Sequence, residues 1–148
     1  IDGRKVEVVY NGIHAGPIVD MEWQDDWTGN TKMDKGFDPM APMFLFVGRM
    51  AVQKGPDLLL DAIPMVLQAR GDAKFVFVGD GHMKAALEGQ AHARGISHAV
   101  SFAGSVKSGT PHLKALFKSC DAVVVPSRNE PFGIVVLEAW GPPGRAWA

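Results

Sequence analysis

The chain has 148 residues, a formal net charge of −1, 47% hydrophobic residues and 21% charged residues. This composition is typical of one globular domain with a substantial core and excludes a long disordered chain. A charge balance this close to zero produces no field that would favour nucleic acid or an anionic membrane surface. No apolar run approaches the roughly 18 residues that a membrane-spanning helix needs, so we expect neither a nucleic-acid partner nor a transmembrane segment.

The two ends and the cysteine content suggest a part of a longer protein in a reducing compartment. The chain opens with Ile1 rather than Met and shows no signal peptide, so we expect its true N-terminus, and any targeting segment, to lie upstream. Cys120 is the single cysteine, which allows no internal disulfide and fits the cytoplasm or a plastid. We interpret Cys120 as a small buried side chain beside a strand rather than as a nucleophile.

Residues 1–42 show little regular pattern. Val6–Tyr10 is a short β-prone run that stops at Asn11–Gly12. The stretch from Ala15 to Pro42 is polar, is rich in glycine and aspartate, and has no sustained period, which predicts a linker or a long loop. We therefore interpret residues 1–42 as the edge of a preceding domain followed by an interdomain linker.

From Met43 onward, apolar runs of strand length alternate with segments of helix length. The predicted strands are 43–47, 74–78, 100–102 and 122–125, and the predicted helices are 56–70, 82–94, 111–119 and one that begins near 133. Pro64 lies inside the first helix and should kink it or lower its stability. The alternation predicts an α/β fold, a Rossmann-like parallel sheet with helices on both faces, over residues 43–140.

The order of the strands predicts where a ligand binds. In open parallel sheets, ligands bind beyond the carboxyl ends of the strands, at the point where the strand order reverses. With the common order 3-2-1-4, this point lies between the first and the fourth strand. The loops that follow these two strands, 48–55 and 127–133, are also the two stretches of the chain that hold most of its candidate ligand-binding residues.

The loop after the first strand combines glycine with two cations. Gly48 would let the backbone turn sharply at the strand end. Arg49 offers a fork of donors suited to phosphate oxygens, and Lys54 adds a second cation on the same short loop. The pair suits a diphosphate, although two solvated surface charges would give the same pattern.

The loop after the fourth strand combines a carboxylate with the start of a helix. The first N–H groups of a helix are unpaired and favour an anion or hydroxyl oxygens, and Gly133 would allow a close approach there. Glu130 could accept hydrogen bonds from two sugar hydroxyls, or could serve as a helix cap. Glu138, eight residues later, could bind a ribose diol or could be an exposed helix residue.

Other ligand classes find little support. Gly79–Gly81 resembles part of a dinucleotide-binding fingerprint but lacks its third glycine and the acidic residue that follows it. The five histidines show no metal-ligand spacing with cysteine or carboxylates, and no G-x-S-x-G or Gly-Lys-Ser/Thr sequence is present. We therefore expect neither a metal nor a cofactor.

Four motifs in the same order resemble a known enzyme family. The run Ser127–Ala139, with Glu130 and Glu138, is similar to the Glu, seven residues, Glu motif of retaining glycosyltransferases of the glycogen synthase and sucrose synthase group (glycosyltransferase family 4 and its relatives). Three further matches are to the phosphate loop of this family, its next strand end and its hinge into the donor domain: Gly48–Arg49 with Lys54–Gly55 and Asp57, Val78–Gly81, and Asn11–Ile13.

The resemblance implies two Rossmann-like domains with the active site between them, of which this chain holds most of the donor-binding half. It implies a nucleotide-sugar donor such as UDP-glucose or ADP-glucose, a carbohydrate or other hydroxyl acceptor, and no metal. By this resemblance, Arg49 and Lys54 would hold the donor diphosphate and stabilise the departing nucleotide. Glu130 would bind the hydroxyls of the donor sugar.

The resemblance also implies the remaining donor contacts. Phe132 and Gly133 would offer backbone N–H groups to the sugar, and Glu138 would bind the ribose. The base would lie against the loop after the third strand, near Ser105 and Val106.

Two departures from the family pattern leave the function of the chain itself open. Residues Gly141–Ala148 do not match the family, and the acceptor-binding first domain is absent. The leading hypothesis is a retaining glycosyltransferase to which this chain supplies the donor site. The alternative is an inactive nucleotide-sugar-binding fragment. A sugar epimerase or a phosphorylase is disfavoured by the paired glutamates and by the lack of a lysine motif for pyridoxal phosphate.

Overall fold

The computed structural model describes residues 31, 32, 34–129, 133 and 135. Eight elements follow one another in this part of the chain: β1 (Met43–Val47), η2 (Val52–Lys54), α3 (Pro56–Ala69), β2 (Lys74–Val78), α4 (Lys84–Ala93), β3 (Val100–Gly104), α5 (Pro111–Ser119) and β4 (Ala122–Val123). The predicted strands and helices of residues 43–123 are therefore present, with ends that differ by a few residues.

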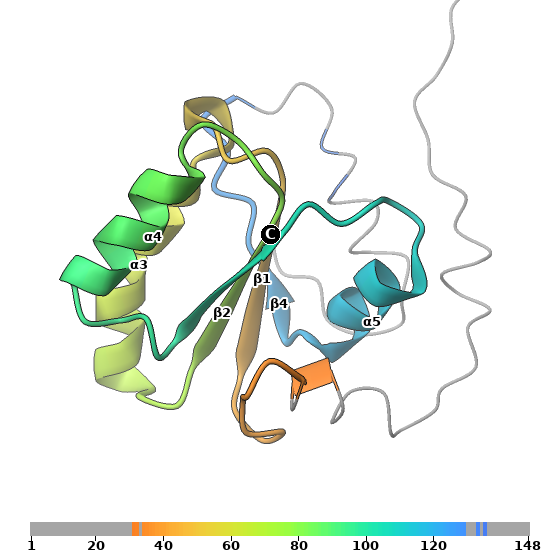
Figure 1. Ribbon diagram of the computed structural model, residues 1–148. Coiled ribbons are helices and arrows are strands. Elements are labelled where there is room, and N and C mark those ends of the chain that lie inside the picture. The colour runs from red at the N-terminus through yellow and green to blue at the C-terminus, as the bar shows by residue number, and fades with distance from the viewer. Residues whose placement is uncertain (1–30, 33, 130–132, 134, 136–148) are drawn as a thin grey trace, which may run out of the picture.

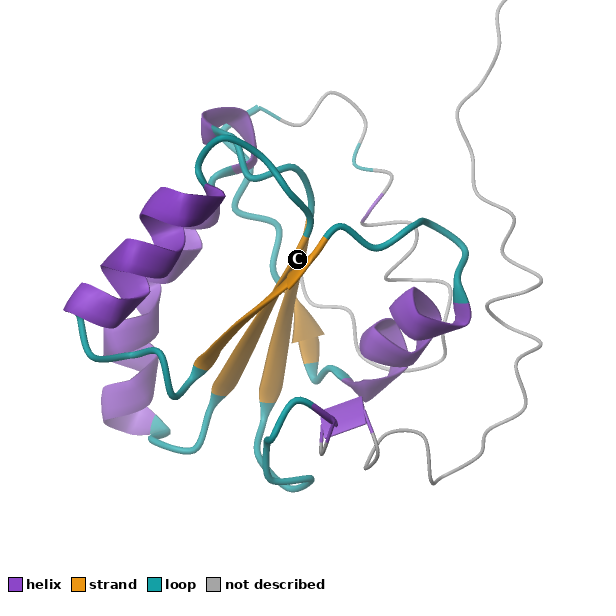
Figure 2. Cartoon of the chain, viewed as in Figure 1, coloured by secondary structure: helices purple, strands orange, loops and turns teal. Residues whose placement is uncertain are grey.

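The strands form one parallel sheet in the order β3-β2-β1-β4. This order confirms the prediction, and it places the reversal of strand order between β1 and β4. Helices α3 and α4 cover one face of the sheet and α5 covers the other (Figures 1 and 2). The fold is the predicted α/β, Rossmann-like arrangement, in which the loops after β1 and β4 start from neighbouring strands.

The strands are apolar on both faces because each face packs against helices. Successive side chains of a strand point to opposite faces, so Phe46 joins the cluster under α3 and α4 while Leu45 joins the cluster under α5. On the α3 and α4 face, neighbouring rings contact one another across the strands, with centroid separations of 5.1 Å for Phe44 and Phe75 and 5.1 Å for Phe77 and Phe102. These two clusters hold the sheet rigid beneath its loops.

Helix α3 runs through Pro64, where the sequence predicts a kink or a loss of stability. Proline has no N–H to give to the carbonyl four residues earlier, which belongs to the fully buried Leu60. Arg94, at the end of α4, supplies the missing donor: its Nη1 lies 3.2 Å from the Leu60 oxygen, and its Nη2 lies 2.6 Å from Asp61. The helix continues to Ala69 because a neighbouring side chain satisfies the carbonyl that proline leaves open.

The prediction of a loop up to Pro42 is wrong for its last part. Residues 31, 32 and 34 are helical, and the aromatic side chain of Phe37 is buried in the cluster under α5. Lys32 is also buried, and its Nζ donates to the Ala41 carbonyl at 2.7 Å and lies 3.4 Å from Asp121. The polar sequence of this stretch does not indicate the burial of Lys32, because the carboxylate that faces its ammonium group belongs to Asp121, 89 residues away.

Two strand ends also differ from the prediction. Strand β3 continues beyond Phe102 to Gly104, with an irregularity in its pairing next to Val78. Strand β4 ends at Val123 rather than Val125, although Val124 still donates its N–H to the Leu45 carbonyl at 2.8 Å. Apolar runs predict where strands lie, but the pairing partners decide where they end.

Candidate functional site

The loop after β1 is built on the loop after β2. The Gly48 N–H donates to the Val78 carbonyl, and the Met50 N–H donates to the Asp80 carbonyl, both at 2.9 Å. Met50 itself is fully buried, and its carbonyl accepts the Met83 N–H at 3.1 Å. Backbone hydrogen bonds thus carry the sheet pairing past the strand ends and fix the loop that bears Arg49 and Lys54.

The loops after β1 and β2 require glycines besides Gly48. The chain bends at Gly48 as predicted, although Gly48 does not adopt a positive φ. Gly79 and Gly81 have φ values of 135° and 155°, and a Cβ on either would lie 2.0 Å from the Gly48 oxygen or 2.4 Å from the Met50 oxygen. Glycine is needed on the β2 loop because the β1 loop packs directly against its backbone.

Arg49 and Lys54 both lie on the β1 loop at the carboxyl edge of the sheet. Arg49 is exposed and Lys54 is half-buried. A Cβ placed on Gly48 would lie 3.9 Å from Lys54 Cγ, so the stem of Lys54 passes close to the end of β1. The predicted pair of cations therefore occupies the edge of the sheet where parallel α/β folds bind their ligands.

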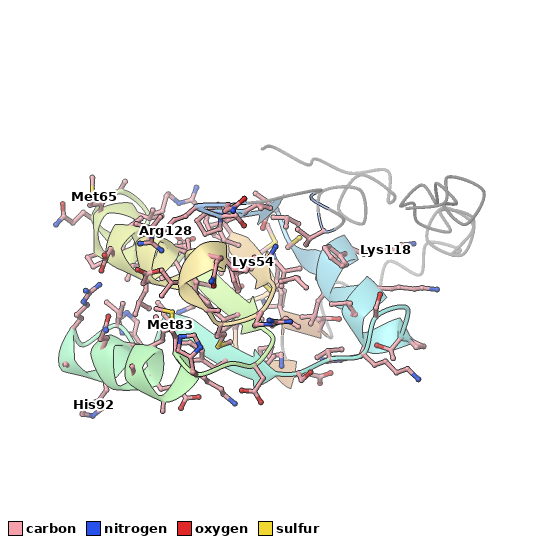
Figure 3. All side chains as sticks on the ribbon, turned by 90° about the horizontal axis from the view of Figure 1, so that it is seen from above. Lys54, Met65, Met83, His92, Lys118 and Arg128 are labelled. Carbon is pink, nitrogen blue, oxygen red and sulfur yellow. The ribbon has the colours of Figure 1, made fainter. Side chains whose placement is uncertain are left out.

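The β4 loop lies against η2, the short helix that includes Lys54. The backbone N–H groups of Arg128 and Asn129 both donate to the Gln53 carbonyl, at 2.9 and 3.3 Å. The Arg128 side chain donates to the Val52 carbonyl at 2.9 Å. Figure 3, which looks down on this edge of the sheet, shows Lys54 and Arg128 in the same region and Lys118 on the far side with α5.

Gly55 ends η2 and begins α3 in a left-handed conformation, with φ of 63°. A Cβ at this position would lie 2.1 Å from the Pro126 oxygen. The β1 loop and the β4 loop therefore meet backbone to backbone at Gly55, directly after Lys54. In the sequence, Gly55 stands out only as part of the motif Lys54–Gly55, and its close contact with Pro126 was not predicted.

Arg128 also forms a two-bond contact with Asp57 in the first turn of α3. Its Nη1 and Nη2 each lie 2.8 Å from one carboxylate oxygen of Asp57. The hydrogen bonds from Arg128 lower the pKa of Asp57 below its usual value, and the same contact raises the pKa of Arg128. Sequence spacing gave no signal for this pair, because 71 residues separate its members.

Three of the predicted site residues, Glu130, Phe132 and Glu138, lie outside the described residues. Gly133 is buried and has φ of 66°, in the region that favours glycine. Val106 lies on the loop after β3 and packs against the cluster under α5. Gly48, Arg49 and Lys54 lie on one loop at the carboxyl edge of the sheet, and the contacts of all eight predicted residues with a donor stay predictions.

The described residues give no support for a metal site, a membrane-spanning helix or a nucleophilic cysteine. Among them, no group of three or more His, Cys, Asp or Glu side chains could hold a metal ion, and no helix is long and apolar enough to cross a membrane. Burial raises the pKa of the Cys120 thiol to about 12, and its Sγ lies 3.2 Å from the Phe117 carbonyl. A thiol that keeps its proton at neutral pH is a poor nucleophile.

Comparison with known sequences shows the family. The profile of the family described as "Glycosyl transferases group 1" matches residues 29–140. The chain belongs to this family. An uncharacterized glycosyltransferase of Methanocaldococcus jannaschii is 43% identical over 136 residues, which cover 91% of this chain and 34% of the relative. Starch synthase 1 of Triticum aestivum is 36% identical over 99 residues, which cover 67% of this chain and 15% of that protein.

Solved structures show the same fold. The Anabaena protein HepE, crystallised with UDP and glucose, has a TM-score of 0.77 at 23% identity over 95% of this chain and 37% of its own. The C-terminal domain of the group 1 glycosyl transferase LpcC from Francisella tularensis has a TM-score of 0.72 at 21% identity, over 91% of this chain and 69% of its own. The chain spans about a third of the length of the first curated relatives that it matches.

Proposed function

We propose that this chain supplies the donor-binding part of a retaining glycosyltransferase, which moves a glycosyl group from a nucleotide sugar to a hydroxyl acceptor. The placement of Arg49 and Lys54 carries the proposal: both cations lie on the loop after β1, where the strand order reverses. Membership of the group 1 family supports the reaction class. HepE, which shares the fold, was crystallised with UDP and with UDP-glucose, which supports a nucleotide sugar as the donor.

The proposed chemistry is stabilisation of a leaving group. When the bond between the sugar and the diphosphate breaks, negative charge grows on the departing phosphate oxygens. Arg49 and Lys54 would take up that charge through charge-assisted hydrogen bonds held in place before the reaction. Their loop is fixed by backbone hydrogen bonds to Val78 and Asp80, so little reorganisation is needed as the charge develops.

The other donor contacts belong to the same proposal. Glu130 would accept hydrogen bonds from the sugar hydroxyls, and Phe132 and Gly133 would donate backbone N–H groups to the sugar. Glu138 would bind the ribose, and Val106 would lie against the base. The donor would be UDP-glucose, ADP-glucose or a related nucleotide sugar. Contacts with the acceptor would come from another domain.

Donor binding can be tested on the 148-residue chain by isothermal titration calorimetry with UDP-glucose and ADP-glucose. We expect one of the two to bind, and we expect Arg49→Ala and Lys54→Ala each to weaken binding about tenfold or more, as lost hydrogen bonds to a charged group do. Arg70→Ala is the matched control, because this exposed arginine lies at the other end of α3. No binding by the unaltered chain, or equal losses in all three variants, would contradict the proposal.

Catalysis separates the proposal from the alternative of an inactive binding fragment. We expect the 148-residue chain alone to show no transfer, because the acceptor contacts lie elsewhere. The full-length protein that carries this sequence should form a glycosidic bond with the anomeric configuration of the donor, which NMR of the product reveals. Inversion of configuration would rule out the retaining mechanism, and a full-length protein that binds the donor without turnover would favour the inactive alternative.

A further inference from the structure

Arg128 connects three segments through its side chain and backbone. Its guanidinium contacts both carboxylate oxygens of Asp57 at 2.8 Å and the Val52 carbonyl at 2.9 Å. Its N–H, with that of Asn129, donates to the Gln53 carbonyl. One residue of the β4 loop thus contacts η2 at two successive carbonyls and the first turn of α3.

These contacts converge on the residues immediately before Lys54. Helix η2 has three residues, Val52–Lys54, and no side chain caps its start. Such a short 3₁₀ turn is weakly held by its own hydrogen bonds. Its internal bonds run from the Lys54 N–H to the Ala51 carbonyl at 3.0 Å and from the Gly55 N–H to the Val52 carbonyl at 3.2 Å, and Arg128 donates to the same Val52 oxygen at 2.9 Å. Arg128 therefore adds a side-chain and a backbone hydrogen bond to those that hold the two residues before Lys54.

The charge of Arg128 is already matched. Asp57 lies in the first turn of α3, where the helix dipole favours a carboxylate, and its two oxygens occupy both outer nitrogens of the guanidinium. A diphosphate would have to compete with this contact to bind Arg128. Arg49 is exposed, and the structure gives it no acidic partner among the described residues. Arg49 and Arg128 therefore differ in whether their charge is already matched by a carboxylate.

We propose that Arg128, oriented by Asp57, is a positioning residue that fixes η2 and so holds Lys54 where it meets the donor diphosphate. This inference rests on the proposed function, and it deepens it by assigning a role to a pair that touches no ligand. Arg128 does not bind phosphate in this scheme. It acts through Lys54, and Asp57 acts through Arg128.

The sign of one substitution distinguishes this role from direct binding of the anion. Asp57→Asn removes a negative charge beside the site and releases Arg128, so simple electrostatics predicts tighter binding of UDP. A positioning role predicts weaker binding, because η2 loses its brace. We expect Asp57→Asn and Arg128→Gln each to weaken UDP binding about five- to tenfold, the size typical of coupled neighbours. Tighter binding in Asp57→Asn would overturn the inference.

A conservative substitution separates geometry from charge. Arg128→Lys keeps the positive charge but cannot form two parallel bonds to Asp57 together with a bond to the Val52 carbonyl. We expect Arg128→Lys to resemble Arg128→Gln in its UDP affinity. Affinity close to that of the unaltered chain would show that charge alone suffices, and would overturn the positioning role.

Coupling to Lys54 is the third readout. Since Arg128 acts through Lys54, Arg128→Gln should change UDP affinity less than twofold in the Lys54→Ala background, where Arg49 still supports weak binding. Equal losses in the two backgrounds would mean that the residues act independently, which contradicts the inference.

Arg94 provides a matched structural control. It too donates to an aspartate of α3 and to a backbone carbonyl, those of Asp61 and Leu60, but it does not contact η2. We expect Arg94→Gln to lower the melting temperature while UDP affinity stays within twofold of the unaltered chain. A comparable loss of affinity in Arg94→Gln would show that Arg128 is only a general stabilising residue.

If the unaltered chain binds neither UDP nor a UDP-sugar nor an ADP-sugar, both the inference and the proposed donor site fail. If Lys54→Ala weakens binding but the Arg128 and Asp57 variants do not, only the inference fails.

Discussion

The two edges of the sheet differ in how closely their connecting segments approach one another. At the carboxyl edge, a Cβ on Gly55, Gly79 or Gly81 would lie between 2.0 and 2.4 Å from a carbonyl oxygen of a neighbouring loop. At the amino edge, a Cβ on Gly71 would be 3.6 Å from the nearest atom, and one on Gly95 would meet nothing within 4 Å. Gly55, Gly79 and Gly81 thus lie where loops pack backbone to backbone, whereas Gly71 and Gly95 lie in open turns.

The difference shows what the glycines are for. Gly95 follows α4 with φ of 68° and meets only the conformational demand of a helix end. Gly55 has nearly the same φ, 63°, but also leaves room for the Pro126 oxygen. The same residue type thus serves chain reversal at the amino edge and the assembly of loops at the carboxyl edge, where the candidate site lies.

The largest expected effect comes from adding one methyl group at each edge. Gly95→Ala should lower the free energy of unfolding by about 1–2 kcal/mol, the cost of a left-handed conformation. Gly55→Ala adds the displacement of the Pro126 backbone, so we expect a loss of roughly 3–5 kcal/mol. Urea unfolding of the two variants measures the difference. Equal losses would mean that the close approach at Gly55 relaxes at no cost, and the contrast between the edges would disappear.

A smaller effect concerns the helix that connects the two edges. Arg128 holds the start of α3 through Asp57, and Arg94 holds its middle through Asp61 and the Leu60 carbonyl that Pro64 leaves open. Pro64→Ala restores the backbone donor and should raise the free energy of unfolding by roughly 1–2 kcal/mol, after the loss of proline's rigidity in the unfolded chain.

The same variant should make Arg94 less important. In the Pro64→Ala background the Leu60 carbonyl has its own helical partner, so Arg94→Gln should lower the free energy of unfolding by less than it does in the unaltered chain. Thermal or urea unfolding of the four proteins gives this comparison. An unchanged cost of Arg94→Gln would show that its bond to Asp61, and not the open carbonyl, is what matters.

The sequence predicted the layers of this fold better than it predicted the contacts between loops. Apolar runs such as 43–47 and 74–78 predict strands because both faces of each strand are buried, and the order 3-2-1-4 followed from a common pattern of α/β sheets. The position of Arg49 and Lys54 at the carboxyl edge followed from the same reasoning. These features depend on local pattern and on rules that hold for all parallel sheets.

The features that were missed depend on partners distant in sequence. Lys32 reads as a surface cation until Ala41 and Asp121 surround it. The need for glycine on the β2 loop was not predicted, and it arises because the backbone of Gly48 fills the space beside Gly79. Arg128 reads as one more loop cation, since nothing in the spacing of the chain indicates Asp57 as its partner. A single sequence shows the residue types, whereas these roles depend on which groups each residue contacts in the folded chain.

The smallest expected effect compares two exposed Arg–Asp contacts, one at each edge, by their response to acid. Hydrogen bonds from Arg128 lower the pKa of Asp57, and hydrogen bonds from Arg70 lower the pKa of Asp72. A carboxyl group whose folded-state pKa is lowered stabilises the folded state above its unfolded-state pKa of about 4. This contribution is lost as the pH falls through the lowered folded-state pKa.

Unfolding measured from pH 7 down to pH 2 should therefore show a small advantage of the unaltered chain over Asp57→Asn and over Asp72→Asn, which shrinks below about pH 4. The two edges should differ in binding rather than in stability. At pH 7, Asp72→Asn should leave UDP affinity unchanged, because Arg70 and Asp72 are two residues apart and connect no loops. If both substitutions instead tighten UDP binding equally, then charge and not loop geometry governs the carboxyl edge.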